Sequence, residues 1–274
     1  MARPWIEFIQ SQNLPWREVP LAGLRGAVQC RVLSEDDVNG ACSLIVRYPA
    51  GWLHAALPFA CNEELLVIDG ELHIGEQQYS PYSYAHFPAG FASGKWRTAT
   101  GAVAVHFFSA RPSIAVVAEP QDIRNLVLHV DGLAAPYTGN FHPEFPPGAG
   151  RKILFQDPDT HDTTWLLGTM PLRWAERAEV HPTIEEMFLL AGEVHGNRGV
   201  MRPGAYFWRP GDRVHGPYGT KTGNLYLFRT KGGALSTQYV AAPVAFHWDP
   251  VYDPIVPREL EPFAKETPAG ASPW

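Results

Sequence analysis

Two neighbouring stretches decide the fold: residues 179–193 read EVHPTIEEMFLLAGE, and residues 201–217 read MRPGAYFWRPGDRVHGP. In the first, polar residues precede an apolar run that ends at Gly192. In the second, a Pro-Gly turn precedes the aromatic run AYFWR, and a Pro-Gly-Asp turn then leads to His215. Short apolar or aromatic runs bounded by Gly, Pro and Asp are typical of β-strands joined by tight turns.

The same pattern occurs earlier in the chain, because the sequence repeats itself at a shift of 122 residues. Residues 31–101 align with residues 153–223 without a gap, and 17 of these 71 positions are identical. Among the identical positions are the turn residues Gly70 and Gly192, Pro81 and Pro203, Pro88 and Pro210, and Gly94 and Gly216. A repeat of this length indicates that one structural unit has been duplicated.

Each copy is expected to form a small β-barrel or jelly roll, because short aromatic and aliphatic runs separated by turn residues recur along it. In the second copy we expect strands at residues 164–170, 186–190, 205–209 and 224–229. Helical patterns are confined to two short segments, Trp5–Gln10 and Arg258–Lys265. The sequence therefore predicts an all-β fold with two tandem barrels.

The repeat and the distribution of proline predict how the chain is divided. We expect an N-terminal barrel at residues 1–110, a linker at residues 111–150, a C-terminal barrel at residues 151–240 and an arm at residues 241–274. The arm holds seven prolines from Pro243 onward, and proline cannot donate a hydrogen bond to a sheet. We expect the arm to pack across its own barrels or across those of a partner in a homodimer.

Composition excludes several classes of function. Hydrophobic residues make up 45% of the 274 residues and charged residues 18%, which predicts a globular protein with a large core. A net charge of −6 without a basic run argues against binding to nucleic acid. No apolar run approaches the roughly 20 residues of a membrane span, and residues 1–10 lack a signal-peptide core. We therefore expect a cytoplasmic protein with no membrane partner, in which Cys30, Cys42 and Cys61 are reduced and buried.

The motifs resemble those of the cupin superfamily. Its first motif places histidines and a glutamate before a strand that ends in glycine, as residues 179–193 do, and its second is a Pro-x-Gly-like turn leading to another histidine. The resemblance covers both repeats, so the chain looks like a bicupin with two double-stranded β-helix barrels. The sequences HP at 181–182, EE at 185–186 and MRPGAYFWRP at 201–210 are similar to those of the ChrR-like group of cupins. This group includes dioxygenases that cleave aryl ketones and β-diketones.

The spacing of three residues in these motifs suits a metal site. His181 and Glu185 are four residues apart, so in an extended strand both side chains point to the same face. His215 follows a turn on a different strand and can bring a second imidazole to the same point. Two imidazoles and one carboxylate form the facial arrangement that suits non-haem Fe(II), although Zn, Mn or Ni could also bind.

Glu179 departs from the family pattern, because it occupies the position of the family's first histidine. A carboxylate there either completes a site of two histidines and two glutamates or points away from it. In the first copy the positions of His181, Glu185 and His215 hold Phe59, Glu63 and Ser93, which predicts a barrel without a metal. A displaced site formed by Glu63 with other histidines is the alternative; the candidates are His54, His86 and His106.

The pocket around this site is expected to have apolar and aromatic walls with a few hydroxyl groups. Alternation along the strands turns Thr183, Met187 and Leu189 to the same side as His181 and Glu185. Tyr206 or Tyr226 is the expected hydrogen-bond donor to a substrate oxygen.

The resemblance and the ligand set together favour a metal-dependent enzyme for a small molecule, with Fe(II) as the favoured ion. The resemblance implies a non-haem iron dioxygenase that cleaves a carbon–carbon bond of a small aromatic or dicarbonyl compound. The alternatives are a redox-neutral lyase, isomerase or hydrolase that uses Zn, Mn or Ni, and a sensor cupin that binds a metal or small molecule without turnover. No dinucleotide or nucleophile motif competes with the metal site.

Overall fold

The computed structural model describes residues 3–18, 28–55, 58–138 and 148–274. Within them the regular structure consists of β-strands and three short 3-10 helices, η1 (Ser11–Asn13), η2 (Ile123–Asn125) and η3 (Glu261–Phe263). The predicted all-β fold is therefore confirmed. In this described part of the chain, no helix has the length and apolar character needed to cross a membrane.

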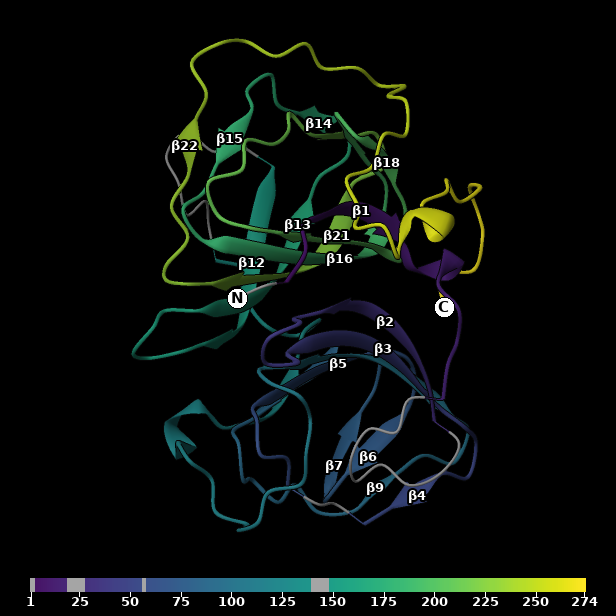
Figure 1. The fold of residues 1–274 in the computed structure, drawn as a ribbon, viewed down its shortest axis with the longest axis vertical. Coiled ribbons are helices and arrows are strands. Elements are labelled where there is room, and N and C mark those ends of the chain that lie inside the picture. Colours follow the sequence, from purple (N-terminus) through teal and green to yellow (C-terminus); the bar gives the residue numbers. More distant parts are fainter. Residues whose placement is uncertain (1–2, 19–27, 56–57, 139–147) are drawn as a thin grey trace. The chain divides into compact units, whose positions relative to one another are not determined.

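The first of two compact units contains Leu14–Ala135 and is built on antiparallel strand pairs (Figure 1). Its large sheet has the order β11 (Val127–Asp131), β8 (Ser83–Phe87), β5 (Glu63–Gly70), β10 (Ala102–Phe108), β3 (Cys42–Tyr48) and β2 (Gln29–Glu35). Its small sheet has the order β4 (Leu53–His54), β9 (Trp96–Arg97), β6 (Leu72–Ile74) and β7 (Gln77–Tyr79).

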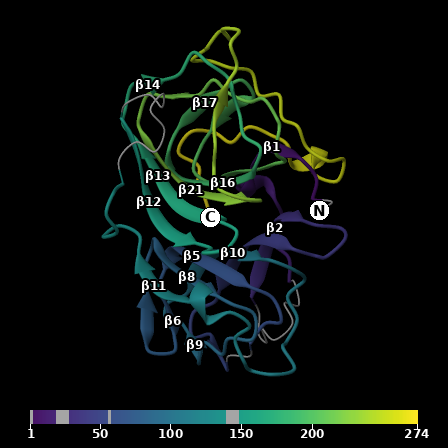
Figure 2. The same cartoon turned by 90° about the vertical axis from the view of Figure 1, so that its left-hand side faces the viewer.

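The second unit contains Pro136–Trp274 together with Pro4–Asn13. Its large sheet has the order β1 (Ile6–Gln10), β19 (Ala205–Arg209), β16 (Ile184–Gly192), β21 (Asn224–Lys231), β13 (Thr163–Thr169) and β12 (Ala149–Gln156). Strands β21, β13 and β12 lie side by side in Figure 2. The smaller sheets are β14 (Arg173–Trp174), β20 (Gly219–Thr220), β17 (Val194–Gly196) and β18 (Gly199–Met201), and the pair β15 (Glu179–Val180) and β22 (Gln238–Tyr239). The four strands predicted in this copy correspond to β13, β16, β19 and β21.

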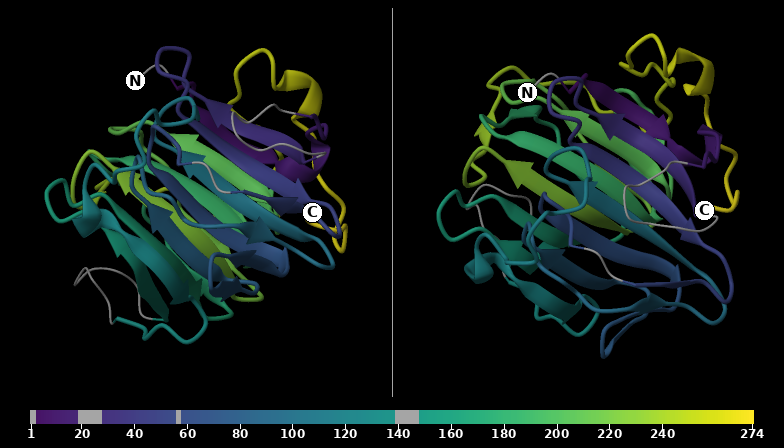
Figure 3. Two further views of the ribbon diagram at one scale, coloured as in Figure 1. Left: turned by 90° about the horizontal axis from the view of Figure 1, so that it is seen from below. Right: turned by 60° about the horizontal axis from the view of Figure 1, so that its bottom comes forward.

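The two large sheets have equivalent strand orders but take one edge strand from different places in the chain. In the first unit, β11 pairs with β8, and it follows that unit's other strands in sequence. In the second unit, β1 pairs with β19, the repeat equivalent of β8, and β1 comes from the start of the chain. The dark purple strand β1 lies beside the green strands of the second unit in Figure 3.

This exchange of edge strands changes the predicted division of the chain. Strand β11 lies inside the expected linker at residues 111–150 yet belongs to the first unit, and β12 begins at Ala149. Residues 139–147 of that linker lie outside the described residues. The expected helix at Trp5–Gln10 is wrong, because Ile6–Gln10 is a buried strand whose hydrogen-bond partner comes from the other end of the chain.

A steric requirement explains why one pair of equivalent positions, Gly70 and Gly192, is glycine in both repeats. Gly70 and Gly192 adopt φ angles of 70° and 77°, in the left-handed region that favours glycine. A Cβ atom would lie 2.2 Å from the Gly101 carbonyl oxygen at Gly70, and 1.9 Å from the Gly223 carbonyl oxygen at Gly192. The duplicated sequence therefore preserves a close backbone approach at the end of β5 and of β16.

The interiors of the two units are filled differently. The core of the first unit is continuous and rich in aromatic side chains, including Tyr48, Trp52, Tyr79, Phe87 and Trp96. The apolar cluster of the second unit instead lines a cavity; its cavity-lining members are Met187, Val194, Met201, Phe207 and Tyr226. Among the described residues, the first unit therefore has a continuous aromatic core, whereas the equivalent cluster of the second unit lines a cavity.

The proline-rich C-terminal arm packs on the second unit. The Ile255 and Glu7 backbones form an antiparallel bridge with two hydrogen bonds of 2.7 Å, so the arm adds to the edge of β1. The Tyr252 hydroxyl donates to the Phe8 carbonyl at 3.0 Å, and their rings meet edge-on. The Trp248 carbonyl accepts a hydrogen bond from Nδ1 of His195 at 2.5 Å. The arm thus covers strands of its own chain, as one of the two expected arrangements requires.

Candidate metal centre

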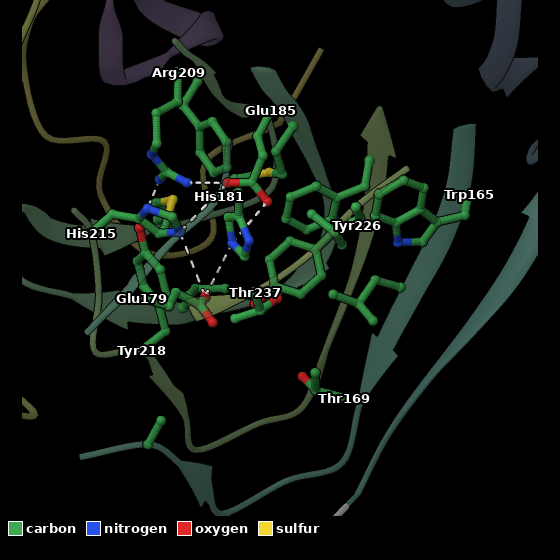
Figure 4. A pocket seen from close by; sticks show the side chains of 18 of the residues that line it. Trp165, Thr169, Glu179, His181, Glu185, Arg209, His215, Tyr218, Tyr226 and Thr237 are labelled. Atoms are coloured by element: carbon green, nitrogen blue, oxygen red, sulfur yellow. Dashed lines mark hydrogen bonds and ion pairs between the residues drawn. The ribbon is translucent and has the colours of Figure 1, made fainter. Parts of the chain in front are cut away.

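Backbone hydrogen bonds bring the predicted ligands together at one end of the second barrel. Glu179 lies on β15, His181 directly follows this strand, and Glu185 is the second residue of β16. His215 follows the turn after β19, and it forms an antiparallel bridge with Glu179 through backbone hydrogen bonds of 2.9 and 3.0 Å. Three chain segments therefore hold the four side chains at one point (Figure 4).

The side chains of Glu179, His181 and His215 converge on a small space. One potential ligand atom from each lies within 4.8 Å of the others, a spacing that suits one metal ion. Nε2 of His215 lies 3.6 Å and Nε2 of His181 4.0 Å from Oε1 of Glu179. The structure thus brings Glu179 into the group rather than turning it away. Among the described residues, no other group of three such side chains comes this close.

Glu185 borders this group from the opposite side. Its Oε1 lies 3.4 Å from Nε2 of His181, and its Oε2 lies 3.5 Å from Nε2 of His215. Oε2 also accepts a hydrogen bond from Nη1 of Arg209 at 2.5 Å. Glu185 therefore has one oxygen, Oε2, that is bound by Arg209 and lies near His215, and a second oxygen, Oε1, that faces His181.

Both imidazoles are oriented so that Nε2 faces the cavity. Nδ1 of His181 donates to the Ser236 carbonyl at 2.9 Å, and Nδ1 of His215 donates to the Arg213 carbonyl at 2.8 Å. A proton held on Nδ1 leaves a lone pair on Nε2, which is the arrangement found in histidine ligands of metals. The two rings lie with centroids 5.0 Å apart, so their Nε2 atoms can share one ion.

The charges of the site favour a divalent cation. Burial alone would raise the Glu179 pKa, but His215 and His181 in their protonated forms, together with Arg209, outweigh burial and hold the Glu179 pKa below its ordinary value. Glu7 lies behind Arg209, and its ion pair with Arg209 likewise holds its pKa low although burial alone would raise it. With both imidazoles uncharged, as metal ligands are, the carboxylates of Glu7, Glu179 and Glu185 and the guanidinium of Arg209 carry a net charge of −2, which a divalent ion would neutralise. The donor set present therefore fits such an ion.

A cavity of about 110 Å³ opens onto these ligands. Most of its wall is apolar or aromatic, and a second part of the wall carries Arg173, Arg177, Thr169, Thr237 and Tyr239. Figure 4 shows Trp165 and Tyr226 on one side of the cavity and Thr169 away from the ligands. A cavity of this size and lining suits a small organic molecule with a few polar groups.

The structure separates the two tyrosines that were expected to contact substrate. Tyr226 lines the cavity, and burial raises its pKa, so its hydroxyl remains protonated at neutral pH. Tyr206 does not line the cavity, because it lies on the opposite face of β19, where its hydroxyl donates to Oε1 of Glu186 at 2.6 Å. Alternation groups residues into two faces but does not say which face is inside. The ladder partners decide this, because Glu185 pairs with Arg209 and Phe188 pairs with Tyr206.

The remaining expected wall residues divide in a similar way. Met187 lines the cavity, whereas Leu189 lies in the buried cluster beneath it and Thr183 is buried beside the ligand segment. Tyr218 is a cavity residue that the sequence did not indicate. Its hydroxyl accepts from Nη2 of Arg209 at 2.8 Å and donates to Oε1 of Glu7 at 3.2 Å. Its position directly after a Gly-Pro pair near His215 was the available signal.

The described residues of the first unit form no such centre, and the glutamate that remains there has a different partner. Phe59 packs edge-on against Phe108, and Ser93 accepts a hydrogen bond from Trp96. Glu63 accepts from Nδ1 of His106 at 2.9 Å, and Nε2 of His106 meets the Tyr48 hydroxyl at 2.9 Å. The expected alternative site of Glu63 with His54, His86 and His106 is not formed: His86 donates to the Asn125 carbonyl and His54 stacks on Trp52.

Solved structures with a similar fold support the assignment of two cupin barrels. A candidate dioxygenase from Nostoc punctiforme is 19% identical, with a TM-score of 0.79, and the match covers 90% of this chain and 92% of that chain. A point mutant of oxalate decarboxylase from Bacillus subtilis is 11% identical with a TM-score of 0.56, covering 85% and 79% of the two chains. At these identities the likeness shows the fold alone.

The sequence comparisons give a family without a described function. No curated protein matches this sequence. Residues 7–237 match the family DUF4437, a domain of unknown function, and this segment runs from β1 to Thr237 in the cavity wall of the second unit. The chain is therefore a member of the DUF4437 family, with the fold of a bicupin.

Proposed function

We propose that this protein is a metal-dependent enzyme, and that it is a non-haem iron dioxygenase which cleaves a carbon–carbon bond of a small aromatic or dicarbonyl compound. One observation carries the proposal: two Nδ1-anchored imidazoles and a carboxylate converge in the wall of a mostly apolar cavity. The dioxygenase description of the Nostoc protein supports the finer assignment.

The residues that would hold the metal are His181, His215 and Glu179, with Glu185 as a further oxygen donor through Oε1. A bound divalent ion would act as a Lewis acid toward substrate oxygens and, as iron, would provide redox chemistry with O2. Because Nδ1 of His181 and of His215 donates to a backbone carbonyl, Nε2 is the atom that each imidazole would offer to the ion.

The cavity wall orients the substrate and excludes water. Trp165, Phe207 and Phe228 form an apolar surface that suits an aromatic ring. Tyr226 is protonated and buried, so its hydroxyl can donate a hydrogen bond to a substrate oxygen but cannot remove a proton at neutral pH. Water exclusion strengthens this hydrogen bond and favours substrates that carry carbonyl or phenolic oxygens.

A redox-neutral reaction is the second candidate, favoured by the likeness to oxalate decarboxylase, a protein with Mn(II) centres. Arg173 and Arg177 in the cavity wall would suit the carboxylate of such a substrate. Turnover without O2, by protein loaded with Mn(II), distinguishes this candidate from the first.

Metal content and oxygen uptake test the proposal. Protein purified without added metal is measured by elemental analysis, then stripped and reloaded anaerobically with Fe(II), Mn(II) or Zn(II). Oxygen consumption is recorded over a panel of aryl ketones, β-diketones and phenols. We expect uptake with Fe(II) alone, lost in His181→Ala and retained in His73→Ala, which alters the repeat-equivalent position of His195 in the unit without a centre. Activity unchanged in His181→Ala would overturn the proposal.

A further inference from the structure

We propose that Glu7, a residue of the first strand of the chain, positions the metal centre of the second unit by holding Arg209 away from full engagement with Glu185. This inference rests on the proposed metal centre and identifies a positioning residue about 200 positions away from the ligand motif. Glu7 touches none of the convergent ligands in the described contacts, so it acts through Arg209.

The guanidinium of Arg209 divides its hydrogen bonds between two carboxylates. Its Nε donates to Oε2 of Glu7 at 2.7 Å, and its Nη2 donates to Oε1 of the same carboxylate. Its Nη1 donates to Oε2 of Glu185 at 2.5 Å. The two-pronged contact that guanidinium groups prefer with carboxylates is therefore made to Glu7, and Glu185 receives a single hydrogen bond.

The surroundings fix this division. Glu7, Glu185 and Arg209 are all buried, so none of the three charges can turn to solvent. Trp5 donates to Oε2 of Glu7 at 3.2 Å, and the Tyr218 hydroxyl bridges Nη2 of Arg209 and Oε1 of Glu7. The guanidinium carbon also lies 4.2 Å from the ring centre of Phe207, which limits its movement along the cavity wall.

The consequence for Glu185 is that one oxygen remains available. With Oε2 held by Arg209, Oε1 is left to face Nε2 of His181 at 3.4 Å. Without the Glu7 charge, Glu185 is the remaining carboxylate partner of Arg209. A two-pronged contact between them would then occupy both oxygens of Glu185. Glu7 thus keeps Glu185 able to contribute to the centre. In the first unit this arrangement is absent, because Phe87 stands at the repeat position of Arg209.

The test compares Glu7→Gln with Glu185→Gln. Each purified full-length protein is stripped with chelator and titrated with Co(II), and the affinity and the visible absorption spectrum are recorded. We expect Glu7→Gln to bind Co(II) about 10–100-fold more weakly, the range typical for loss of a residue that orients a ligand. We also expect its spectrum to resemble that of Glu185→Gln, and the double variant to bind no more weakly than Glu185→Gln alone.

A matched control separates positioning from general destabilisation. Glu186 is a buried carboxylate on the same strand whose side chain accepts from Arg229 and from Tyr206. Glu186→Gln therefore removes a comparable buried charge from the other face of the sheet, and we expect it to retain the wild-type Co(II) affinity and spectrum. If Glu7→Gln fails to fold, Tyr218→Phe replaces it in the test. This variant keeps both charges but removes the hydroxyl that bridges Arg209 and Glu7, and we expect it to weaken Co(II) binding as well.

The outcomes distinguish this inference from the function on which it rests. A Glu7→Gln protein with wild-type affinity and spectrum would overturn the positioning role alone, as would an effect that adds fully to that of Glu185→Gln. Wild-type protein that binds none of Co(II), Fe(II), Mn(II) or Zn(II) would overturn the proposed function, and the positioning role with it.

Discussion

At the scale of single residues, the site depends on where each buried proton and charge resides. Nδ1 of His181 and Nδ1 of His215 each donate a hydrogen bond to a backbone carbonyl. The backbone thereby selects the tautomer that presents Nε2 to the cavity. Arg209 carries the charge that makes two further buried carboxylates tolerable. The acid–base character of the centre is therefore set by residues that are not ligands.

Removing the Arg209 charge should destabilise the protein strongly. Arg209→Met leaves Glu7 and Glu185 buried without their cation, and breaking such a buried pair costs about 3–5 kcal/mol of the free energy of unfolding. Arg111→Met is the control, since its pair with Glu35 is exposed and such pairs contribute under about 1 kcal/mol. Urea unfolding of the metal-free proteins measures both. Equal losses in the two variants would contradict this account.

The stabilising effect of Glu7 should disappear in acid. Its pKa in the folded protein is held below the ordinary value of 4.5, because the opposing effect of burial is outweighed by Arg209. The stability that Glu7 contributes is therefore present above the ordinary pKa and is lost as the pH falls through the folded value. We expect the difference in unfolding free energy between wild type and Glu7→Gln to be largest near neutral pH and to shrink below pH 4.5. Urea titrations of metal-free protein at several pH values test this, and a constant difference down to about pH 3, well below the ordinary carboxyl pKa, would refute it.

Much of the ligand set can be predicted from sequence, and the limits have physical causes. His181, Glu185 and His215 are recognisable from the motif and its spacing, but the reason differs from strand alternation: His181 follows β15, residues 182 and 183 form a bend, and Glu185 lies on β16. Tyr206 was assigned to the wrong face because both faces of β19 are buried, so polarity does not mark the inside. Glu7 gave no signal, because its partner Arg209 lies 202 residues away.

At the scale of elements, strand ends are fixed by close backbone contacts that repeat in both units. The turn at Gly192 brings the end of β16 against the start of β21, and the same turn occurs at Gly70. The sequence repeat predicted the fold because these turn residues survive duplication. It could not predict the exchanged strands, since β1 and β11 lie outside the aligned segments 31–101 and 153–223.

Substitution of Gly192 should lower the free energy of unfolding by more than its left-handed backbone conformation alone explains. Gly192→Ala places a methyl group 1.9 Å from the Gly223 carbonyl oxygen, so the two strands must move apart. Gly51→Ala is the matched control, because Gly51 has a similar φ of 73° but no atom within 4 Å of the new methyl group. We expect Gly51→Ala to cost about 1–2 kcal/mol and Gly192→Ala about 1–3 kcal/mol more. Thermal or urea unfolding gives both values, and equal costs would rule out the steric contribution.

At the scale of the whole molecule, one unit carries the cavity and the other has a filled interior. The first unit differs from the second in more than its ligands: Phe87 stands at the position of Arg209, and Nδ1 of His106 contacts Oε1 of Glu63 at 2.9 Å. Restoring the missing histidines should therefore not restore a site. The expected homodimer remains a prediction, which light scattering coupled to gel filtration tests.

The double variant Phe59→His/Ser93→His tests this asymmetry directly. It rebuilds both missing imidazole positions in the first unit while leaving Phe87 and the Glu63–His106 contact in place. We expect elemental analysis to show one metal ion per chain in both wild type and the double variant. Two ions per chain would mean that the filled interior of the first unit does not prevent metal binding.

The exchanged edge strand also has a consequence for how the protein is made. Gln10 on β1 pairs with Ala205, 195 residues further along the chain. At about 5–20 residues per second, a ribosome needs roughly 10–40 s to supply that partner. During this interval β1, which belongs to the second unit, has no β19 to pair with, while the segments of the first unit are already available to fold. Arg209 therefore receives its two-pronged partner Glu7 from a segment made 202 residues earlier.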